Sequence, residues 1–301
     1  MIHRKGTIGR CTTMNISKKW RFIFLLPATA LFLFVYAVPV ATLIGTSFTE
    51  WIVASEPVFI GIDNYIELFS DEEFLQATWN TIIWMFLQST IHIAIGVMLA
   101  LILARKKFYW KFTRTVFMLP NIISSAAVGM LFVLLLNPSF GAVNSVLTQL
   151  GFTDLPNWFM SRETSFISVT MTWLPYAGIV TILLMAEMTS LSDSIMEAAI
   201  MDGATEMQKN IYIVLPLTKT IIGTTTILGA TSMLQKLDLV MMTTKGAPGN
   251  MTMNLPLYVY NTAFIANDFG LANTSGVLMI ILGLVAVAII NRIYKTENHY
   301  Y

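Results

Sequence analysis

Apolar residues along the chain gather in six long stretches that are separated by polar segments. A helix that crosses a hydrocarbon core of about 30 Å needs roughly 20 apolar residues, and each stretch reaches that length. They cover about residues 22–48, 79–104, 115–136, 164–187, 218–240 and 271–293. Because none of them alternates apolar and polar positions, we predict helices rather than barrel strands. The pattern therefore predicts an all-α membrane protein with six transmembrane helices.

Composition agrees with this class and excludes several others. Of the 301 residues, 55% are apolar and only 12% are charged, about half the usual charged share of a soluble domain. The mean hydropathy is +0.68, which excludes a soluble globular or disordered chain. A formal charge of +1 offers no surplus of cations for nucleic acid. The single cysteine, Cys11, excludes a disulfide framework, and three scattered histidines argue against a metal site.

The first apolar stretch contains an A-x-A sequence at Ala28–Ala30, so a cleavable signal peptide has to be considered. Only five apolar residues, Phe22–Leu26, precede it, and the apolar run continues to Phe48. A signal peptide needs a longer apolar region before its cleavage site. We therefore expect a retained helix. Translation could begin at Met1 or equally at Met14.

Basic residues predict the orientation of the helices. The segment 1–21 holds six of them and the loop 105–114 holds five, whereas the segment 49–78 holds seven acids and no Lys or Arg. The positive-inside rule then places both termini and the loops 105–114 and 188–217 in the cytoplasm, and the segment 49–78 outside. These assignments divide the chain into a cytoplasmic N-terminal segment, a transmembrane domain and a cytoplasmic tail, at 1–21, 22–293 and 294–301.

The loop 188–217 is long for a helical bundle and carries signals for two short helices. One begins after a capping signal at Ser192 and ends at Gly203; a second covers 205–214 and ends before Pro216. Two short helices with a small apolar side form a docking surface for another protein. The alternative is an amphipathic helix that rests on lipid, and both interpretations stay open from these residues alone.

A spaced motif lies in this loop: Glu197-Ala198-Ala199, then Gly203, then nine residues, then Ile213-x-Leu215-Pro216. It resembles the EAA loop of ABC importer permeases and matches every fixed position of E-A-A-x3-G-x9-I-x-L-P. Residues 20–295 are also similar to the larger permease subunit of maltose-type and glycerol-phosphate-type importers. Matching positions outside the loop are Ser47–Trp51, Phe59–Tyr65, Leu68–Phe69, Asn80–Thr81, Leu119–Pro120, Asp238, Gly246–Pro248, Tyr258, Tyr260 and Phe264. At Ala247 the family usually has glycine.

The resemblance implies a type I ABC importer permease fold in the cytoplasmic membrane of a prokaryote. It implies uptake of a sugar or oligosaccharide from an extracytoplasmic solute-binding protein, together with a second homologous permease subunit and two cytoplasmic ATPase subunits. The loop would sit in a cleft of an ATPase subunit, where Gly203 allows a turn at which a Cβ atom would clash. The expected coupling residues are Glu197, Ala198, Ala199, Asp202, Gly203, Ile213, Leu215 and Pro216.

The chain contains no G-x-x-x-x-G-K-[ST] sequence, so we expect no ATP hydrolysis and no cofactor in it. ATP and Mg²⁺ are expected in the partner ATPase subunits. Two other classes of membrane protein have different requirements. An ion-coupled secondary carrier needs ionisable groups near several helix midpoints, and an intramembrane protease needs a nucleophilic serine motif or paired acids; the six stretches provide neither set.

One cation lies inside an apolar stretch: Lys236, two residues before Asp238. A charged side chain at this depth costs roughly 2.5–3.5 kcal/mol on insertion scales, so it should face the bundle interior or water. It could pair with Asp238 or extend to the outer interface. Alternatively, Lys236 lines a substrate path with Ser232 and Gln235, although the family usually has an apolar residue at its position.

Other polar and aromatic residues within the stretches are weaker candidates. Trp173 and Tyr176 flank Pro175, where they could stack on a sugar ring or pack around a proline kink. Gln88 and His92 lie four residues apart on one helix face. For that pair we expect an interhelical hydrogen bond rather than a ligand.

Overall fold

A computed structural model describes residues 18–104, 108 and 110–294, and these form two compact units that divide between Gly45 and Thr46. The predicted N-terminal segment up to Ser17, with Cys11 and Met14, lies outside the described residues. So do parts of the basic loop (105–107 and 109) and the tail from Lys295 onward. The described chain is almost entirely helical, as the apolar stretches predict.

The first unit is formed by one long helix that continues into the second unit as far as Thr46. It comprises α1 (Lys18–Phe32), a π-helical turn η1 (Leu33–Ala37) and α2 (Val38–Thr46). Its apolar side chains are exposed, as expected of a surface that meets lipid or another apolar helix. The hydroxyls of Thr29 and Thr42 donate to carbonyl oxygens four residues earlier, so they remain hydrogen-bonded in an apolar environment. The structure continues this helix past Ala30, as predicted.

Three further helices are long and apolar enough to cross a membrane. One joins α4 (Glu72–Leu87), the π turn η2 (Gln88–His92) and α5 (Ile93–Ala104). A second joins α9 (Ser165–Trp173), the 3₁₀ turn η3 (Leu174–Ala177) and α10 (Gly178–Met188). The third is α17 (Phe269–Ile293). Each matches a predicted apolar stretch: two of the six ends coincide with the predicted ones, and the others differ by at most seven residues.

One predicted helix is instead a bent pair, and a second bent pair joins the loop 188–217 to the fifth apolar stretch. The stretch 115–136 forms α6 (Trp110–Ile122) and α7 (Ser125–Leu135), which meet at 106°. The helix predicted there is interrupted, because Ser124 has extended backbone and caps a new helix, accepting a hydrogen bond from the Ala127 amide. In the described residues, four helices qualify as membrane spans, or six if each bent pair counts as one.

The second bent pair has an angle of 70° between the segments 206–217 and 219–235. The latter consists of α14 (Lys219–Ser232) and the 3₁₀ turn η5 (Met233–Gln235). The predicted helix 218–240 is not continuous, because the backbone of Lys236 leaves the helical region with φ −83° and ψ 61°. A separate helix, α15 (Leu237–Thr243), follows it.

Short elements close one end of the second unit. Strands β1 (Thr49–Glu50) and β2 (Val58–Phe59) pair antiparallel, and α3 (Asp63–Ser70) follows them. Other short helical elements of this unit are α8 (Ala142–Gln149), α16 (Leu255–Tyr260) and the π turn η6 (Asn261–Ile265). The amide of Asn80 donates to the carbonyl oxygens of Met251 and Met253 and thereby ties the irregular chain before α16 to α4.

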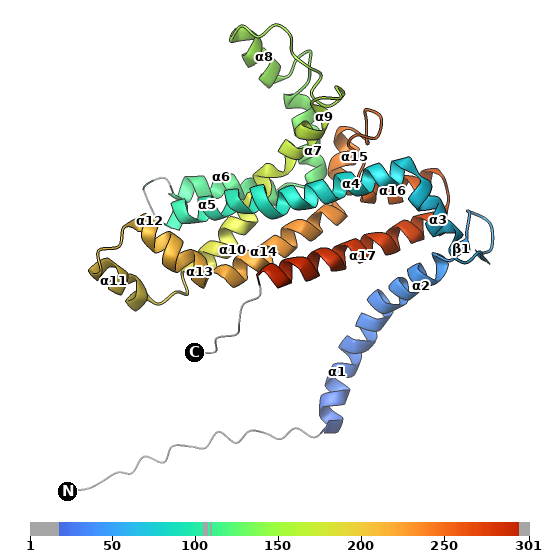
Figure 1. The fold of residues 1–301 in the computed structure, drawn as a ribbon, viewed down its shortest axis with the longest axis horizontal. Helices are drawn as coiled ribbons and strands as arrows, with labels where there is room; N and C mark the ends of the chain where they lie inside the picture. The colour runs from blue at the N-terminus through green and yellow to red at the C-terminus, as the bar shows by residue number, and fades with distance from the viewer. Residues whose placement is uncertain (1–17, 105–107, 109, 295–301) are drawn as a thin grey trace. The chain divides into compact units, whose positions relative to one another are not determined.

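In the second unit, α4–α5, α14 and α17 lie alongside one another (Figure 1). The loop that carries α11 (Asp193–Met201) and α12 (Glu206–Lys209) lies at the end where α5 and α17 finish, opposite α3 and α16 (Figure 1). Trp84 lies in the buried core, stacked on Phe166 at 4.9 Å and edge-on to Trp173 at 6.3 Å. This core holds α9 against α4 and so positions Trp173.

Candidate functional sites

The loop between α10 and α14 forms the first candidate site. Its first helix, α11, ends at Met201, and Gly203 then turns the chain with φ +78°. The amide of Ala204 donates to Ala199 and that of Gly203 to Ile200, at 2.9 and 3.0 Å, which is the Schellman ending of a helix. The predicted stop at Gly203 is confirmed. A Cβ atom there would meet nothing in this chain within 4 Å, so the glycine is needed here for its positive φ.

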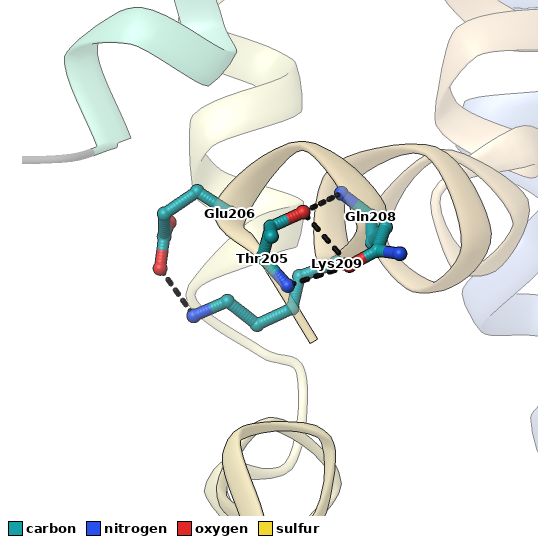
Figure 2. A network of polar contacts seen from close by, with 4 residues as sticks. All are labelled: Thr205, Glu206, Gln208 and Lys209. Atoms are coloured by element: carbon teal, nitrogen blue, oxygen red, sulfur yellow. Dashed lines mark hydrogen bonds and ion pairs between the residues drawn. The ribbon is translucent and has the colours of Figure 1, made fainter. Parts of the chain in front are cut away.

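A capping box starts the second helix of the loop. The Thr205 amide donates to Gln208 Oε1 at 2.8 Å, and the Gln208 amide donates to Thr205 Oγ1 at 3.3 Å (Figure 2). Lys209 and Glu206 form an ion pair beside it (Figure 2). These local contacts stabilise the helix start without help from the rest of the bundle.

We predicted that this second helix ends before Pro216, and that prediction is wrong. It continues through the π turn η4 (Asn210–Val214) into α13 (Leu215–Leu217), and the 70° bend follows at Thr218. The π turn widens the backbone just before Pro216, which has no amide hydrogen to give to the preceding turn. The helix therefore tolerates the proline and carries the loop directly into α14.

The coupling residues predicted from the motif fall into two groups. Asp202, Gly203 and Ile213 line one hollow of about 260 Å³ together with Gln208 and Tyr212. Glu197 and Ala198 are exposed on α11 outside that hollow, Ala199 is buried, and Leu215 and Pro216 lie on α13. Several large apolar side chains are also exposed on the loop: Ile195, Ile200, Met201, Met207, Ile211 and Tyr212. Such a surface is typical of a contact with another protein.

The second candidate site is a cavity of about 130 Å³ in the middle of the bundle, which we call the central cavity. Four residues predicted to line a substrate path meet there: Trp173, Tyr176, Ser232 and Lys236. The fifth, Gln235, does not line it. Gln235 is exposed and faces a neighbouring cavity of about 400 Å³, which shares Ser232 and Lys236 with the central one. Lys236 therefore lies between the two cavities.

Lys236 and Asp238 do not form the ion pair that was one of the predicted alternatives. Within the described residues the Lys236 ammonium lies 4.6 Å from the centre of the Tyr176 ring, a cation–π contact, and no ion pair joins it to an acid within 4.0 Å. The carboxylate of Asp238 accepts from the Ser125 hydroxyl and, at 2.9 Å, from the Leu239 amide. Both residues line the adjoining cavity, at the helix break between η5 and α15.

Gln88 and His92 also line the central cavity, although we expected them to form an interhelical hydrogen bond. That expectation is wrong for two of their atoms: Gln88 Oε1 and His92 Nδ1 are buried without a hydrogen-bond partner, as is the Tyr176 hydroxyl. The two residues bound the π turn η2, which directs both into the cavity. The sequence signal for this site is the presence of polar side chains in the middle of an apolar span. We interpreted that signal as a hydrogen bond to a neighbouring helix, whereas the two side chains line a cavity.

The two sites occur in a chain with clear relatives. Residues 92–296 match the family described as binding-protein-dependent transport system inner membrane component. The sulfoquinovosyl glycerol transport system permease protein of Agrobacterium fabrum is 30% identical over 92% of this chain and 90% of its own. A probable starch degradation products permease of Thermoanaerobacterium thermosulfurigenes is 29% identical over 93% and 94%.

A solved structure has the same fold. It is the bacterial alginate ABC transporter in complex with alginate pentasaccharide-bound periplasmic protein, 25% identical, with a TM-score of 0.80 over 92% of this chain and 96% of the matched one. The predicted type I ABC importer permease fold is confirmed by this similarity. The family match covers more than half of the described sequence and includes the whole loop from α11 to α13. The chain therefore belongs to the family of binding-protein-dependent transport system inner membrane components.

Proposed function

We propose that this chain is the permease subunit of an ATP-driven importer, which receives a sugar or oligosaccharide from an extracytoplasmic binding protein. The named substrates of the relatives support this class, since they are starch degradation products, sulfoquinovosyl glycerol and alginate. The complex of the alginate transporter with its periplasmic protein supports the binding-protein partner. An ion-coupled secondary carrier is not supported by any of these similarities.

The observation that carries the proposal is the loop from α11 to α13. Its helix ends at a glycine with φ +78°, and its exposed surface combines Glu197 with uncovered apolar side chains such as Met201 and Met207. In the proposed complex this surface sits on an ATPase subunit, and Glu197 pairs with a basic or donor group there. Because α13 continues across a single bend into α14, movement of the segment from α12 to α13 would reach the wall of the central cavity through α14.

The assembled importer would contain a second homologous permease subunit and two ATPase subunits, which bind ATP and Mg²⁺. The pair α6–α7 and the segment 219–235 would each form one span, giving six in total with both termini in the cytoplasm of a prokaryotic cell. The path of the solute would pass Trp173, Tyr176, Ser232 and Lys236, with Gln235 at the adjoining cavity. Closure of the ATPase subunits would shift the two permease subunits between inward-open and outward-open states.

The test is uptake by proteoliposomes that contain the complete complex and its binding protein. We expect uptake to require ATP on the side of the membrane where the ATPase subunits lie. We also expect uptake to continue when an ionophore removes the ion gradients. Uptake that the ionophore abolishes, with ATP present, would contradict the proposal and favour a secondary carrier.

Labelling of single cysteines tests the orientation, in a Cys11→Ser background. An impermeant thiol reagent added to intact cells should label Glu56→Cys and should not label Met201→Cys, both of which lie at exposed positions.

A further inference from the structure

The central cavity contains polar atoms that the protein leaves without partners. Gln88 is 4% exposed and His92 3% exposed, yet Gln88 Oε1 and His92 Nδ1 form no hydrogen bond, and the buried Tyr176 hydroxyl forms none either. Buried polar groups are nearly always hydrogen-bonded, because leaving them unpaired after removal from water is costly. Three of the six such atoms in the described residues belong to residues that line this one cavity, which fits a ligand rich in hydroxyl groups, since hydroxyls both donate and accept.

The same cavity has a cation, Lys236, that forms no ion pair in the described part of the chain. Lys236 is partly buried, and no described acid lies within 4.0 Å of its ammonium. The nearby carboxylate of Asp238 already accepts from Ser125 and the Leu239 amide. An ammonium held over an aromatic ring keeps most of its surface free for an anion, because the ring contributes no hydrogen-bond acceptor.

The backbone fixes the place of this cation. Lys236 lies at the break between η5 and α15, and its carbonyl oxygen accepts from the Asn254 amide at 2.8 Å. Ser232 and Lys236 both line the central cavity and the adjoining one, so the ammonium lies where the two join. A solute that moves from one cavity to the other must pass it.

We propose that Lys236 makes the central cavity an anion subsite, so that the transported solute is a saccharide unit bearing a carboxylate or sulfonate. This inference rests on the proposed importer function and specifies its substrate class. The ammonium pairs with the acid group, and the hydroxyls of the same unit satisfy Gln88, His92 and Tyr176. A neutral sugar would leave the partly desolvated cation without an anion in contact with it and with only the cation–π contact to Tyr176, which is the less favourable arrangement.

The first test measures the charge preference of the cavity and needs no transport. Ser232→Cys is introduced into the complete transporter in nanodiscs, with Cys11→Ser, and its reaction rates with sulfonatoethyl and trimethylammonioethyl methanethiosulfonate are compared. We expect Lys236→Met to lower the anionic-to-cationic rate ratio about tenfold and Lys236→Arg to retain it. Glu56→Cys, on the exposed turn between β1 and β2, is the matched control whose ratio Lys236→Met should leave unchanged.

The second test asks whether a sugar acid occupies the site. Galacturonate should slow the labelling of Ser232→Cys more than galactose does at the same concentration, and Lys236→Met should remove the difference. An unchanged rate ratio, equal protection by the two sugars, or no protection by either would overturn the anion subsite. These outcomes leave ATP-dependent uptake by the native complex untouched. Conversely, a complex that shows the anion preference but no ATP-dependent uptake would refute the importer function alone.

Discussion

The hydroxyl of Thr181 in α10 donates a hydrogen bond of 3.1 Å to the carbonyl oxygen of Gly96 in α5. The same hydroxyl bonds the Ala177 carbonyl within its own helix at 3.0 Å, so it joins the two helices without losing a local bond. Such a contact between a side chain and a helix backbone requires close approach, and a glycine provides the space. A Cβ atom added to Gly96 would lie 2.5 Å from the Cβ of Val180.

Gly96→Ala should therefore destabilise the protein, by about 1–3 kcal/mol, because α5 and α10 must separate. The measurement is the thermal unfolding midpoint of the purified complex in lipid nanodiscs. Gly129→Ala is the matched control: it is also a buried helical glycine, but its added Cβ would meet no atom closer than 3.4 Å. Equal midpoints for the two variants would contradict the close approach of α5 and α10.

Gly203→Trp should uncouple ATP hydrolysis from transport while the protein still inserts into the membrane. The backbone strain of a non-glycine residue at φ +78° costs about 1–2 kcal/mol, and the bulky ring would occupy the surface that faces the ATPase subunit. The measurement is the ratio of solute transported to ATP hydrolysed in proteoliposomes.

Gly151→Trp separates strain from coupling. Gly151 has φ +94° and, like Gly203, open space around its Cβ position, but it follows α8, outside the coupling loop. This variant should share the small loss of stability and keep the transport ratio. Normal coupling in Gly203→Trp would show that the turn is not enclosed by an ATPase subunit.

Lys236→Met should leave the amount of assembled complex unchanged and lower uptake, because no described ion pair is lost. Asp238→Ala should reduce assembly, since it removes the acceptor of the Ser125 hydroxyl and with it a link between α15 and α7. Assembly of each variant is measured by size-exclusion chromatography and uptake in proteoliposomes. If Lys236→Met lowers assembly and Lys236→Met with Asp238→Ala restores it, the two residues form an ion pair after all.

Tyr258 provides a prediction that depends on pH. Its hydroxyl donates to Asp71 Oδ2 at 2.5 Å and ties α16 to the start of α4; burial and this hydrogen bond raise the pKa of Tyr258 above its ordinary value of 10.0. The folded protein therefore favours the neutral hydroxyl. This contribution is fully present below about pH 10, where the unfolded chain also keeps the proton, and it falls above that pH as the unfolded chain ionises.

Tyr258→Phe should accordingly lower the stability by about 1.5–3 kcal/mol, equally at all pH values between 6 and 9. Above about pH 10 the difference between the two proteins should shrink. Thermal unfolding midpoints across this range check both statements. A difference that changes steadily between pH 6 and 9 would mean that another group controls it.

The long apolar stretches were enough to predict most of the helices, because a chain in a membrane must satisfy its backbone within each span. The breaks inside them were not predictable. Ser124 and Lys236 each interrupt a run that remains apolar on both sides, and their backbone angles depend on tertiary contacts such as the bond from Asn254 to the Lys236 carbonyl. Hydrophobicity indicates that a segment lies in the membrane, but it carries little information on where the helix bends or breaks.

The two candidate sites differed in the same way. The coupling loop is local in sequence, so a spaced motif and capping residues were sufficient to predict the helix stop at Gly203. The central cavity is lined by residues from three separate spans. One sequence alone does not show which residues of different spans lie next to each other. Gln88 and His92 were recognised as polar positions on one helix face, but whether they meet a neighbouring helix or an open cavity depends on how α4, α9 and α14 pack.

Because a π turn lies at 88–92, the number of residues in this segment sets the rotation of α5 relative to α4. A π turn accommodates one residue more than a regular α-helix, so the two halves of this span are out of phase by one position. Deleting any one residue from 88–92 would regularise the helix and rotate α5 by about 100° relative to α4. The core contacts of Trp84 would then be incompatible with the approach of Gly96 to Val180. Insertions and deletions here are therefore far more restricted than substitutions of the same residues.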